Sequence, residues 1–494
     1  MPQFETTPPI PYVPISEKAT EVRSAIDAAR LSNDNSFGGL QKLAIPGPFA
    51  TDAEASTNGV PDDNLYYRSD GTVRAASHLS LDLAFALDKT LTARVGPTPM
   101  FTRSQTSATG STYVGADKLI KYADNNEARF DHGPITGVCK GLLIEEQRTN
   151  AVQHSANFKN TTSSNYWENT SATTVTVDQI ASPDGGVNAD LLTTSATSFD
   201  CFFRRLSSWA GSTQYTYSIF LKQGPSNHRY VGLYIGAGTG LTQFPFFDFN
   251  NPTVVQIPSG TMVGTINSTK VDAYPNGWYR VIVTFTTSAT PVNTSCGSYI
   301  STSNGTLPGS SAAGLDAYVW GIQSELGSFA SSYIPTTTAP LIRSADVCSY
   351  TDVSSFYNPA AGTLVGDLIL YTPPPSGIPE LFRFGSGNNR IQFGVTNVVS
   401  EAIRPFIING GTETYSTKQG TTVAGTSRKV AITFATNDAI SCLNGTLGVQ
   451  DTSVTMPVSI STAFIGASSF TGHIASIRYY KKRLTNFKLQ SLTS

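Results

Sequence analysis

Residues 278–286 read WYRVIVTFT, and this stretch decides the fold class. Its side chains alternate between two faces with the period of two that is typical of a β-strand. One face carries Tyr279, Val281, Val283 and Phe285, and the other carries Arg280, Ile282 and Thr284. The pattern therefore predicts a regular strand within a β-rich region.

Comparable runs surround it between residues 151 and 340. They are TTVTVDQIA, YTYSIFLKQ, RYVGLYIG and DAYVWGIQSEL, and clusters of Gly, Pro, Asn and Ser separate them. Many short strands at this spacing predict an antiparallel sandwich or jelly roll over residues 151–340.

A second β module is expected over residues 341–494, and a proline-bracketed linker at 332–347 spans the boundary between the two modules. Its runs include TLVGDLILYT, RIQFGV, KVAITFA and HIASIRYY, and its last residues, LTNFKLQSLT, predict one closing helical turn. We therefore expect a mainly β, multidomain protein built of antiparallel β-sandwiches.

The first 150 residues have a different texture. Residues 1–57 hold a Pro-rich arm and a short helix from Ser16, which is too narrow in its apolar stripe to be stable alone. Residues 58–150 predict a small mixed β connector, with a hairpin around Asp70-Gly71 between LYYRS and TVRA. We expect the arm and helix to attach to a partner or to copies of the chain, and we expect no secretory signal.

The composition excludes several classes of protein. Charged residues make up only 14% of the chain, against the roughly 25% of an average globular protein. The net charge of −2 offers no basic field for nucleic acid or for an anionic membrane surface. No apolar run is long enough to predict a membrane span.

The cysteines and acids predict neither a metal site nor a cofactor. The five cysteines are spread widely, without a C-x-x-C pair, so we expect buried free thiols. Calcium would need clustered oxygen ligands, whereas Asn437, Asp438 and Asp451 of the C-terminal module are scattered.

Catalysis is not predicted. Glu145 and Glu146 are adjacent and would point to opposite faces of a strand, so they cannot form a glycosidase pair, and we expect them to pair with Arg129 or Arg148. His132 beside Asp131 is expected to brace a loop. Motifs for a nucleophile, zinc, phosphate or dinucleotide are missing from the sequence, which predicts a protein that is not an enzyme.

Four stretches resemble the tail-fibre and head-fibre proteins of phage particles. NGVPDDNLYYRSDGTVR (58–74) resembles a short module near the start of such appendages, and ARFDHGPITGVCKGLLIEEQRTN (128–150) resembles their R-F-D-x-x-P-x-T-G signature. DAYVWGIQSELGSFASSYIPTTTAPLIRSADV (316–347) is similar to the segment that closes their carbohydrate-binding-like jelly roll. The part from FYNPAAGTLVGDL (356–368) onward looks like a concanavalin-A-like, laminin-G-type sandwich.

The resemblance implies a structural protein of a virion, assembled in the host cytoplasm and released by lysis. The N-terminal region would attach to another virion protein, such as capsid, portal, tail tube or baseplate. The threefold fibres of the family imply a homotrimer, and the resemblance implies no catalytic role.

Adhesion to a host-surface glycan would need an exposed aromatic ring beside hydrogen-bonding side chains. Trp278 and Trp320 lie in apolar strands and are predicted core residues, whereas Trp209 lies in the polar stretch RRLSSWAGSTQ. We therefore predict that Trp209 stacks on sugar, and that Asn389 and Arg390 of GNNRIQ line a binding edge in the C-terminal module.

The favoured function is a fibre-like or spike-like appendage that binds host-surface glycans. A capsid-attached head fibre or decoration protein without a specific receptor is the alternative. A polysaccharide depolymerase is the least favoured, and the composition suits all three.

Overall fold

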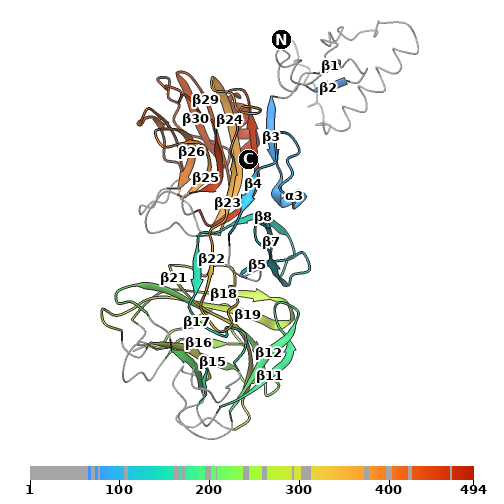
Figure 1. Cartoon of the computed structure of the whole chain (residues 1–494), viewed down its shortest axis with the longest axis vertical. Helices are drawn as coiled ribbons and strands as arrows, with labels where there is room; N and C mark the ends of the chain where they lie inside the picture. Colours follow the sequence, from blue (N-terminus) through green and yellow to red (C-terminus); the bar gives the residue numbers. More distant parts are fainter. Residues whose placement is uncertain are drawn as a thin grey trace, which may run out of the picture. The chain divides into compact units, whose positions relative to one another are not determined.

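The computed structural model of the chain is shown in Figure 1. It describes residues 65–67, 73–75, 78–104, 110–158, 167–169, 173–194, 202–206, 209–236, 244–258, 264–291, 294–301, 313–371, 379–395, 403–420, 425–467 and 470–494. The chain divides into two compact units, Met1–His78 and Leu79–Ser494, and each is described by itself.

The first unit contains a short hairpin. β1 (Leu65–Tyr67) pairs antiparallel with β2 (Val73–Ala75), and Leu65 lies opposite Ala75. This pairing confirms the hairpin predicted around Asp70-Gly71. The predicted arm and helix of residues 1–57 lie outside the described residues.

Strands between residues 168 and 326 of the second unit form two antiparallel sheets, which we call the first sandwich (Figure 1). One sheet has the spatial order β11 (Thr173–Ala181), β12 (Val187–Thr194), β21 (Asp316–Leu326), β14 (Gln214–Gln223), β19 (Trp278–Thr286) and β18 (Thr265–Tyr274). The other has the order β10 (Glu168–Asn169), β13 (Phe202–Leu206), β20 (Ser295–Ile300), β15 (Tyr230–Gly236), β16 (Phe246–Asp248) and β17 (Val255–Gln256). A 3-10 turn, η1 (Pro275–Gly277), joins β18 to β19.

The core of the first sandwich confirms the strand predicted from WYRVIVTFT. β19 buries Val281, Val283 and Phe285 in a cluster that both sheets share. Its opposite face is buried too, because the chain after β21 crosses it, and Arg280 donates from NH1 to the Ser331 carbonyl at 2.8 Å. The predicted core residues Trp278 and Trp320 are indeed buried, on this second face of the sheet.

Two further antiparallel sheets form the second sandwich. One has the order β28 (Thr412–Ser416), β27 (Ile403–Asn409), β26 (Asn389–Val395), β25 (Glu380–Ser386), β32 (Ala463–Ala467), β23 (Val347–Tyr350) and β4 (Met100–Thr102). The other has the order β31 (Thr446–Leu447), β30 (Asp438–Leu443), β29 (Ser427–Ala435), β24 (Ala361–Leu370), β33 (Gly472–Tyr480), β8 (Cys139–Ile144) and β7 (Arg129–His132). β3 (Leu79–Leu83) pairs with another part of β33. The prediction of a mainly β fold of antiparallel sandwiches is therefore confirmed.

The pairing of the second sandwich corrects the predicted division of the chain. The sequence predicts a separate connector over residues 58–150, but β3, β4, β7 and β8 pair with strands from the C-terminal region. Leu142 of β8, for example, lies opposite Ile474 of β33. Figure 1 shows these blue and teal strands beside orange and red ones. The first sandwich is thus inserted into the second, so the predicted modules at 151–340 and 341–494 are not consecutive units.

The chain passes from one sandwich to the other through a two-stranded antiparallel ribbon. β9 (Arg148–Asn150) leads into the insertion, and β22 (Leu341–Arg343) leads out of it, with Asn150 opposite Leu341. Asn150 is fully buried, and its amide donates to the carbonyls of Ile322 and Ile334. The ribbon is therefore tied to the first sandwich at the point of entry.

The remaining elements are short. α3 (Phe85–Asp88) is a single helical turn, and β5 (Ser111–Val114) forms a hairpin with β6 (Ile120–Ala123). α4 (Asn486–Thr493) confirms the closing helix; Thr485 caps it by accepting the Lys488 N–H. Within the described parts no helix has the length and apolar character to cross a membrane.

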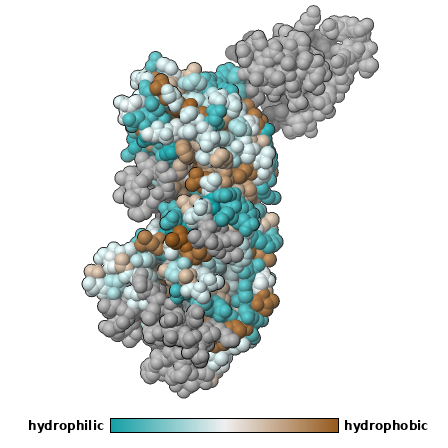
Figure 2. Space-filling model, viewed as in Figure 1, coloured by the Kyte–Doolittle hydropathy of each residue, from teal (hydrophilic) through white to brown (hydrophobic). Residues whose placement is uncertain are grey.

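The described cysteines and surface agree with a protein that buries its apolar groups. Cys296, Cys348 and Cys442 are buried free thiols and Cys139 is partly buried, whereas Cys201 lies outside the described residues. On the face drawn in Figure 2, hydrophobic residues lie in small groups among hydrophilic ones. Among the described residues of that face, Figure 2 shows no broad apolar patch of the kind that marks large interfaces.

Candidate functional site

The structure places Trp209 in the core and not in an exposed loop. Its side chain is 6% exposed, and its ring lies 5.0 Å from that of Phe285 and 6.0 Å from that of Tyr215. Its indole N–H donates to Ser324 Oγ at 3.2 Å. The expected exposed ring is therefore wrong, because a single hydrogen bond satisfies the polar edge of the indole inside the sandwich.

Asn389 and Arg390 lie where β26 begins, and both are partly exposed. Asn389 Oδ1 accepts the Gly410 N–H at 2.9 Å, so its side chain braces the neighbouring turn. Arg390 donates from Nε to Gln392 at 2.7 Å, and its guanidinium lies 5.6 Å from the centre of the Phe406 ring. Arg390 carries no ion pair to a described carboxylate, so it stays a predicted contact for sugar at this edge.

The signature stretch 128–150 builds a buried ion network at the junction of the two sandwiches. Arg129 on β7 contacts Glu145 at 2.7 Å and Asp346 at 2.5 Å. Arg343 contacts Glu145 at 2.9 Å, and Arg103 contacts Asp346 at 3.0 Å. All five side chains are fully buried. Segments from β4, β7, β8, β22 and the start of β23 are therefore held together by charge.

The predicted pairing of the acids is confirmed, because Glu145 binds Arg129 and Glu146 binds Arg148 at 2.6 Å. Burial alone would raise the pKa of Glu145, but the charges of Arg343 and Arg129 outweigh it and lower that pKa to about 2. Glu145 is thus ionised and out of contact with solvent. Such a carboxylate holds structure and cannot donate a proton to a substrate.

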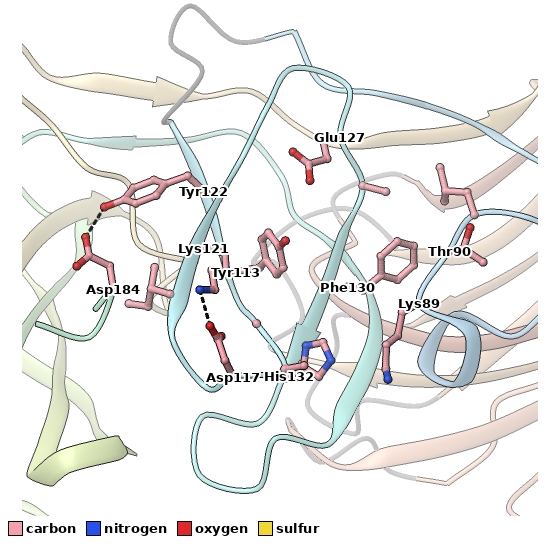
Figure 3. Close-up of a pocket in the computed structure, with 15 residues that line it drawn as sticks. Lys89, Thr90, Tyr113, Asp117, Lys121, Tyr122, Glu127, Phe130, His132 and Asp184 are labelled. Carbon is pink, nitrogen blue, oxygen red and sulfur yellow. Dashed lines mark hydrogen bonds and ion pairs between the residues drawn. The ribbon is translucent and has the colours of Figure 1, made fainter. Parts of the chain in front are cut away.

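The other face of β7 borders an open groove. Arg129 and Asp131 point to the junction, whereas Phe130 and His132, which alternate with them, line the groove. β5, β6 and the chain after α3 complete its walls, and its volume is about 1050 Å³ (Figure 3). One strand therefore supports the junction on one side and a solvent-facing hollow on the other.

Several charged groups of the groove are already committed to partners. Lys121 pairs with Asp117 at 2.5 Å, and the Tyr122 hydroxyl donates to Asp184 at 2.7 Å (Figure 3). Glu127 accepts the Asp124 N–H at 2.7 Å. These contacts fix the β5–β6 hairpin and shape the rim of the groove.

Among the described residues, other polar groups of the groove still have hydrogen-bonding atoms or charges without a partner. His132 donates from Nδ1 to the Val114 carbonyl at 3.0 Å, so in the neutral ring Nε2 is an acceptor, and Nε2 has no partner. This bond confirms the bracing role predicted for His132. Tyr113 is partly exposed, and burial followed by the charge of Glu127 raises the pKa of its hydroxyl, which stays a neutral donor. Lys89, at the end of α3, makes no ion pair with a described acid.

The groove combines partly exposed rings with hydrogen-bonding groups. Phe130 and Tyr113 can stack on the apolar face of a sugar, and His132, Tyr113 and Lys89 can bind hydroxyl oxygens. The sequence analysis missed it, because the lining comes from four elements. Its one local signal was the alternation in RFDH, where an aromatic and a histidine share a face.

The described residues also include side chains of the types that hold metal ions. They contain no group of three or more His, Cys, Asp or Glu that could hold a metal ion. Asp438, weighed above for calcium, pairs with Arg483 at 2.8 Å, and Asp451 accepts the Ser453 N–H at 2.8 Å.

No known family model matches the chain, and no curated protein matches it. Among solved structures, the carbohydrate-binding domain CBM40 of the Ruminococcus gnavus IT-sialidase, bound to α2,3-sialyllactose, has a TM-score of 0.25 and 18% identity, covering 28% of this chain and 84% of that one. Chicken galectin 2 has a TM-score of 0.20 and 12% identity over 26% of this chain and 96% of that one. Domains LG4-5 of the mouse laminin α1 chain have a TM-score of 0.20 and 10% identity over 57% and 88%. The class of the protein, a pair of antiparallel β-sandwiches with one inserted into the other, is defined by its own strand pairing.

Proposed function

We propose that this protein is a non-enzymatic virion appendage that binds host-surface glycan in the groove of Figure 3. The main observation behind the proposal is the composition of the groove. Tyr113 and Phe130 present rings beside the Nε2 atom of His132, which has no hydrogen-bond partner. An aromatic face next to fixed hydrogen-bonding groups suits the alternating apolar and hydroxyl faces of a sugar.

The virion location is proposed from the resemblance of residues 58–74, 128–150 and 316–347 to phage fibre proteins. The N-terminal region would attach the protein to the particle, and the sandwiches would project as a homotrimer. The proposal of a protein without catalysis is supported by the junction network, in which Glu145 is buried and bound by Arg129, Arg343 and Ser332.

Sugar binding is tested with a glycan array, followed by titration of the best glycan. Tyr113→Ala removes both stacking and a hydroxyl, so we expect a loss of about 2 kcal/mol, or roughly 30-fold in affinity. Tyr230→Ala is the matched control, because Tyr230 is also partly exposed but lies outside the groove. Equal affinities of Tyr113→Ala and Tyr230→Ala for the glycan would show that the sugar binds outside the groove.

The location is tested by immunogold electron microscopy of intact particles with an antibody against residues 348–494. Label at the tail favours receptor binding, and label over the head favours the alternative of a head fibre or decoration protein. Light scattering of the full-length chain tests the trimer, and a monomer contradicts it. Release of reducing ends from a polysaccharide would revive the depolymerase.

A further inference from the structure

A second hollow lies between the two sandwiches, within the unit Leu79–Ser494. Its volume is about 750 Å³, which is within the usual size range of small-ligand sites. β18 and β19 of the first sandwich supply Ser268, Arg280 and Thr284 to one wall, and the second sandwich supplies Asp131 and His473 to the other. Interfaces between domains are frequent places for such sites.

The two walls lie close enough to interact electrically. Burial, followed by the charges of Asp131, Glu145 and Asp272, raises the pKa of Tyr371 well above its usual value. Tyr371 lies just after β24 of the second sandwich, whereas Asp272 belongs to β18 of the first. A ligand in the cleft would therefore meet groups from both sandwiches.

Arg280 brings to this cleft a positive charge that has no carboxylate partner among the described residues, and its guanidinium lies 5.4 Å from the centre of the Phe220 ring. Its side chain is 6% exposed, and it donates from Nε and NH2 to Ser218 Oγ, at 3.3 and 3.0 Å, and from NH1 to the Ser331 carbonyl. All of these acceptors are neutral. Asp272, opposite Arg280 in the β18–β19 pair, contacts Lys270 at 3.0 Å instead.

A buried charge is expected to have a counter-charge, and none of the described carboxylates is within ion-pair distance of Arg280. A guanidinium has five N–H donors, of which these contacts use three. Two donors thus remain for an anionic group. A carboxylate matches the planar, forked geometry of arginine.

The opposite wall offers an acceptor without a net charge. His473 is fully buried, and its Nε2 lies 2.8 Å from Asp131 Oδ2 and 3.1 Å from the Tyr371 hydroxyl. Because a carboxylate only accepts, Nε2 of the neutral ring donates, which leaves Nδ1 as an acceptor, and Nδ1 has no partner. Lys140 contacts the same Asp131 oxygen at 2.8 Å and balances its charge.

We infer that this cleft binds a sugar that carries a carboxylate, with the carboxylate on Arg280 and a ring hydroxyl donating to Nδ1 of His473. Hydroxyl side chains such as Ser268, Thr284 and Ser328 line the space, and tyrosine rings border it, as suits a polyhydroxylated ligand. Arg280 and His473, on which this site depends, do not line the groove of the proposed function, although Tyr113 and Ile120 border both hollows.

The test compares oligogalacturonate with its fully methyl-esterified form, which keeps the rings and removes the charge. Isothermal titration calorimetry with the full chain is expected to show that the acid binds and that the ester binds at least 10-fold more weakly. The affinity for the acid is expected to fall as the salt concentration rises. Arg280→Gln is expected to lower affinity for the acid at least 10-fold and leave that for the ester unchanged.

Two exposed positions of β18 provide variants that keep Arg280 intact. Ser268→Trp places a ring in the cleft and is expected to abolish binding, whereas Thr265→Trp, outside the cleft, is the matched control and is expected to bind as the wild type does. Lys89→Ala, which changes a residue that lines the groove but not the cleft, should leave acid binding unaltered, and this separates the cleft from the groove.

Three results would overturn the inference: equal binding of acid and ester, full binding of the acid by Ser268→Trp, or no binding of the acid by the wild-type chain. If Arg280→Gln fails to fold, the comparison of Ser268→Trp with Thr265→Trp still tests whether the acid binds in the cleft.

Discussion

Glu145→Gln is predicted to break the coupling of the two sandwiches. The carboxylate lies at the centre of the junction, where it accepts from Arg129 and Arg343 and from the N–H and hydroxyl of Ser332. Glutamine keeps the shape but leaves the buried Arg343 without its ion-pair partner, and Arg129 is left with Asp346 alone.

The structure sets the size of the effect. A shift of the pKa of Glu145 from its usual 4.5 to about 2 corresponds to about 3 kcal/mol of preference for the ionised form. Removal of one partner from a buried ion pair usually costs about 3–5 kcal/mol, which is consistent with this value. We therefore expect the free energy of unfolding to fall by about 3–5 kcal/mol.

The four tryptophans make the assay selective. Trp167, Trp209, Trp278 and Trp320 all belong to the first sandwich, so their fluorescence follows that sandwich alone. Circular dichroism in the far ultraviolet follows strands of both. In urea, the two signals are expected to change together for the wild type and at separate midpoints for Glu145→Gln.

Glu413→Gln is the matched control, because Glu413 pairs with Arg404 at 2.6 Å on the surface, where its side chain is 42% exposed. An exposed pair contributes at most about 1 kcal/mol. A cost for Glu145→Gln as small as that of the control, with coincident midpoints, would refute the coupling role of the network.

Three further predictions concern stability. Gly141→Ala is expected to cost more than about 1 kcal/mol in urea unfolding, because Gly141 has φ +111° and an added Cβ would lie 2.2 Å from the Ile474 carbonyl oxygen. Trp209→Ala is expected to lower the free energy of unfolding by about 3–5 kcal/mol, because it leaves a cavity in the core. A Trp209→Ala variant that stays folded should bind glycan normally. Loss of glycan binding in a folded variant would contradict a purely structural role for Trp209. Burial raises the pKa of Asp190 to about 6, so acidification from pH 7 to 5 protonates this buried carboxyl and should raise the free energy of unfolding. The folded chain lowers the pKa of Glu145 to about 2, so below about pH 4.5 the unfolded chain binds a proton at Glu145 that the folded chain does not, and the free energy of unfolding should fall. Urea midpoints at pH 7, 5 and 3 test both signs.

The strands were predictable because their signal is local. In WYRVIVTFT, alternation alone separates Val281 and Val283 from Ile282, and the two faces of β19 agree with it. The insertion was not predictable in this way. The pairing of Leu142 with Ile474 joins residues more than 300 positions apart, and neither sequence contains a mark of the other.

The site residues show the same division. Trp209 was misplaced because its polar neighbours in RRLSSWAGSTQ say nothing of Phe285 and Tyr215, which enclose its ring. The salt bridges of Glu145 and Glu146 were predicted correctly, since opposite charges lay nearby in the sequence. The groove needed β5, β6, β7 and α3 together, and only the alternation of Phe130 and His132 was visible beforehand.

The structure also gives a physical reason for the signature stretch. Arg129 and Glu145 hold the junction, Gly141 permits a close approach of β8 to β33, and Asn150 ties the ribbon to the first sandwich. These residues support the insertion, whereas Phe130 and His132 of the same stretch line the groove. The stretch therefore combines structural residues with residues of the proposed binding groove.

The ribbon of β9 and β22 also decides how the protein would carry mechanical tension. Leu79 and Ser494 both belong to the second sandwich, and the first sandwich leaves and returns at a single point, where Asn150 faces Leu341. A pull between Leu79 and Ser494 would unzip β3 from β33, because Leu79 lies opposite Tyr480, and would then stretch the second sandwich, while the first lies outside the line of force. In single-molecule pulling, the first sandwich should lengthen only after the strands of the second have come apart.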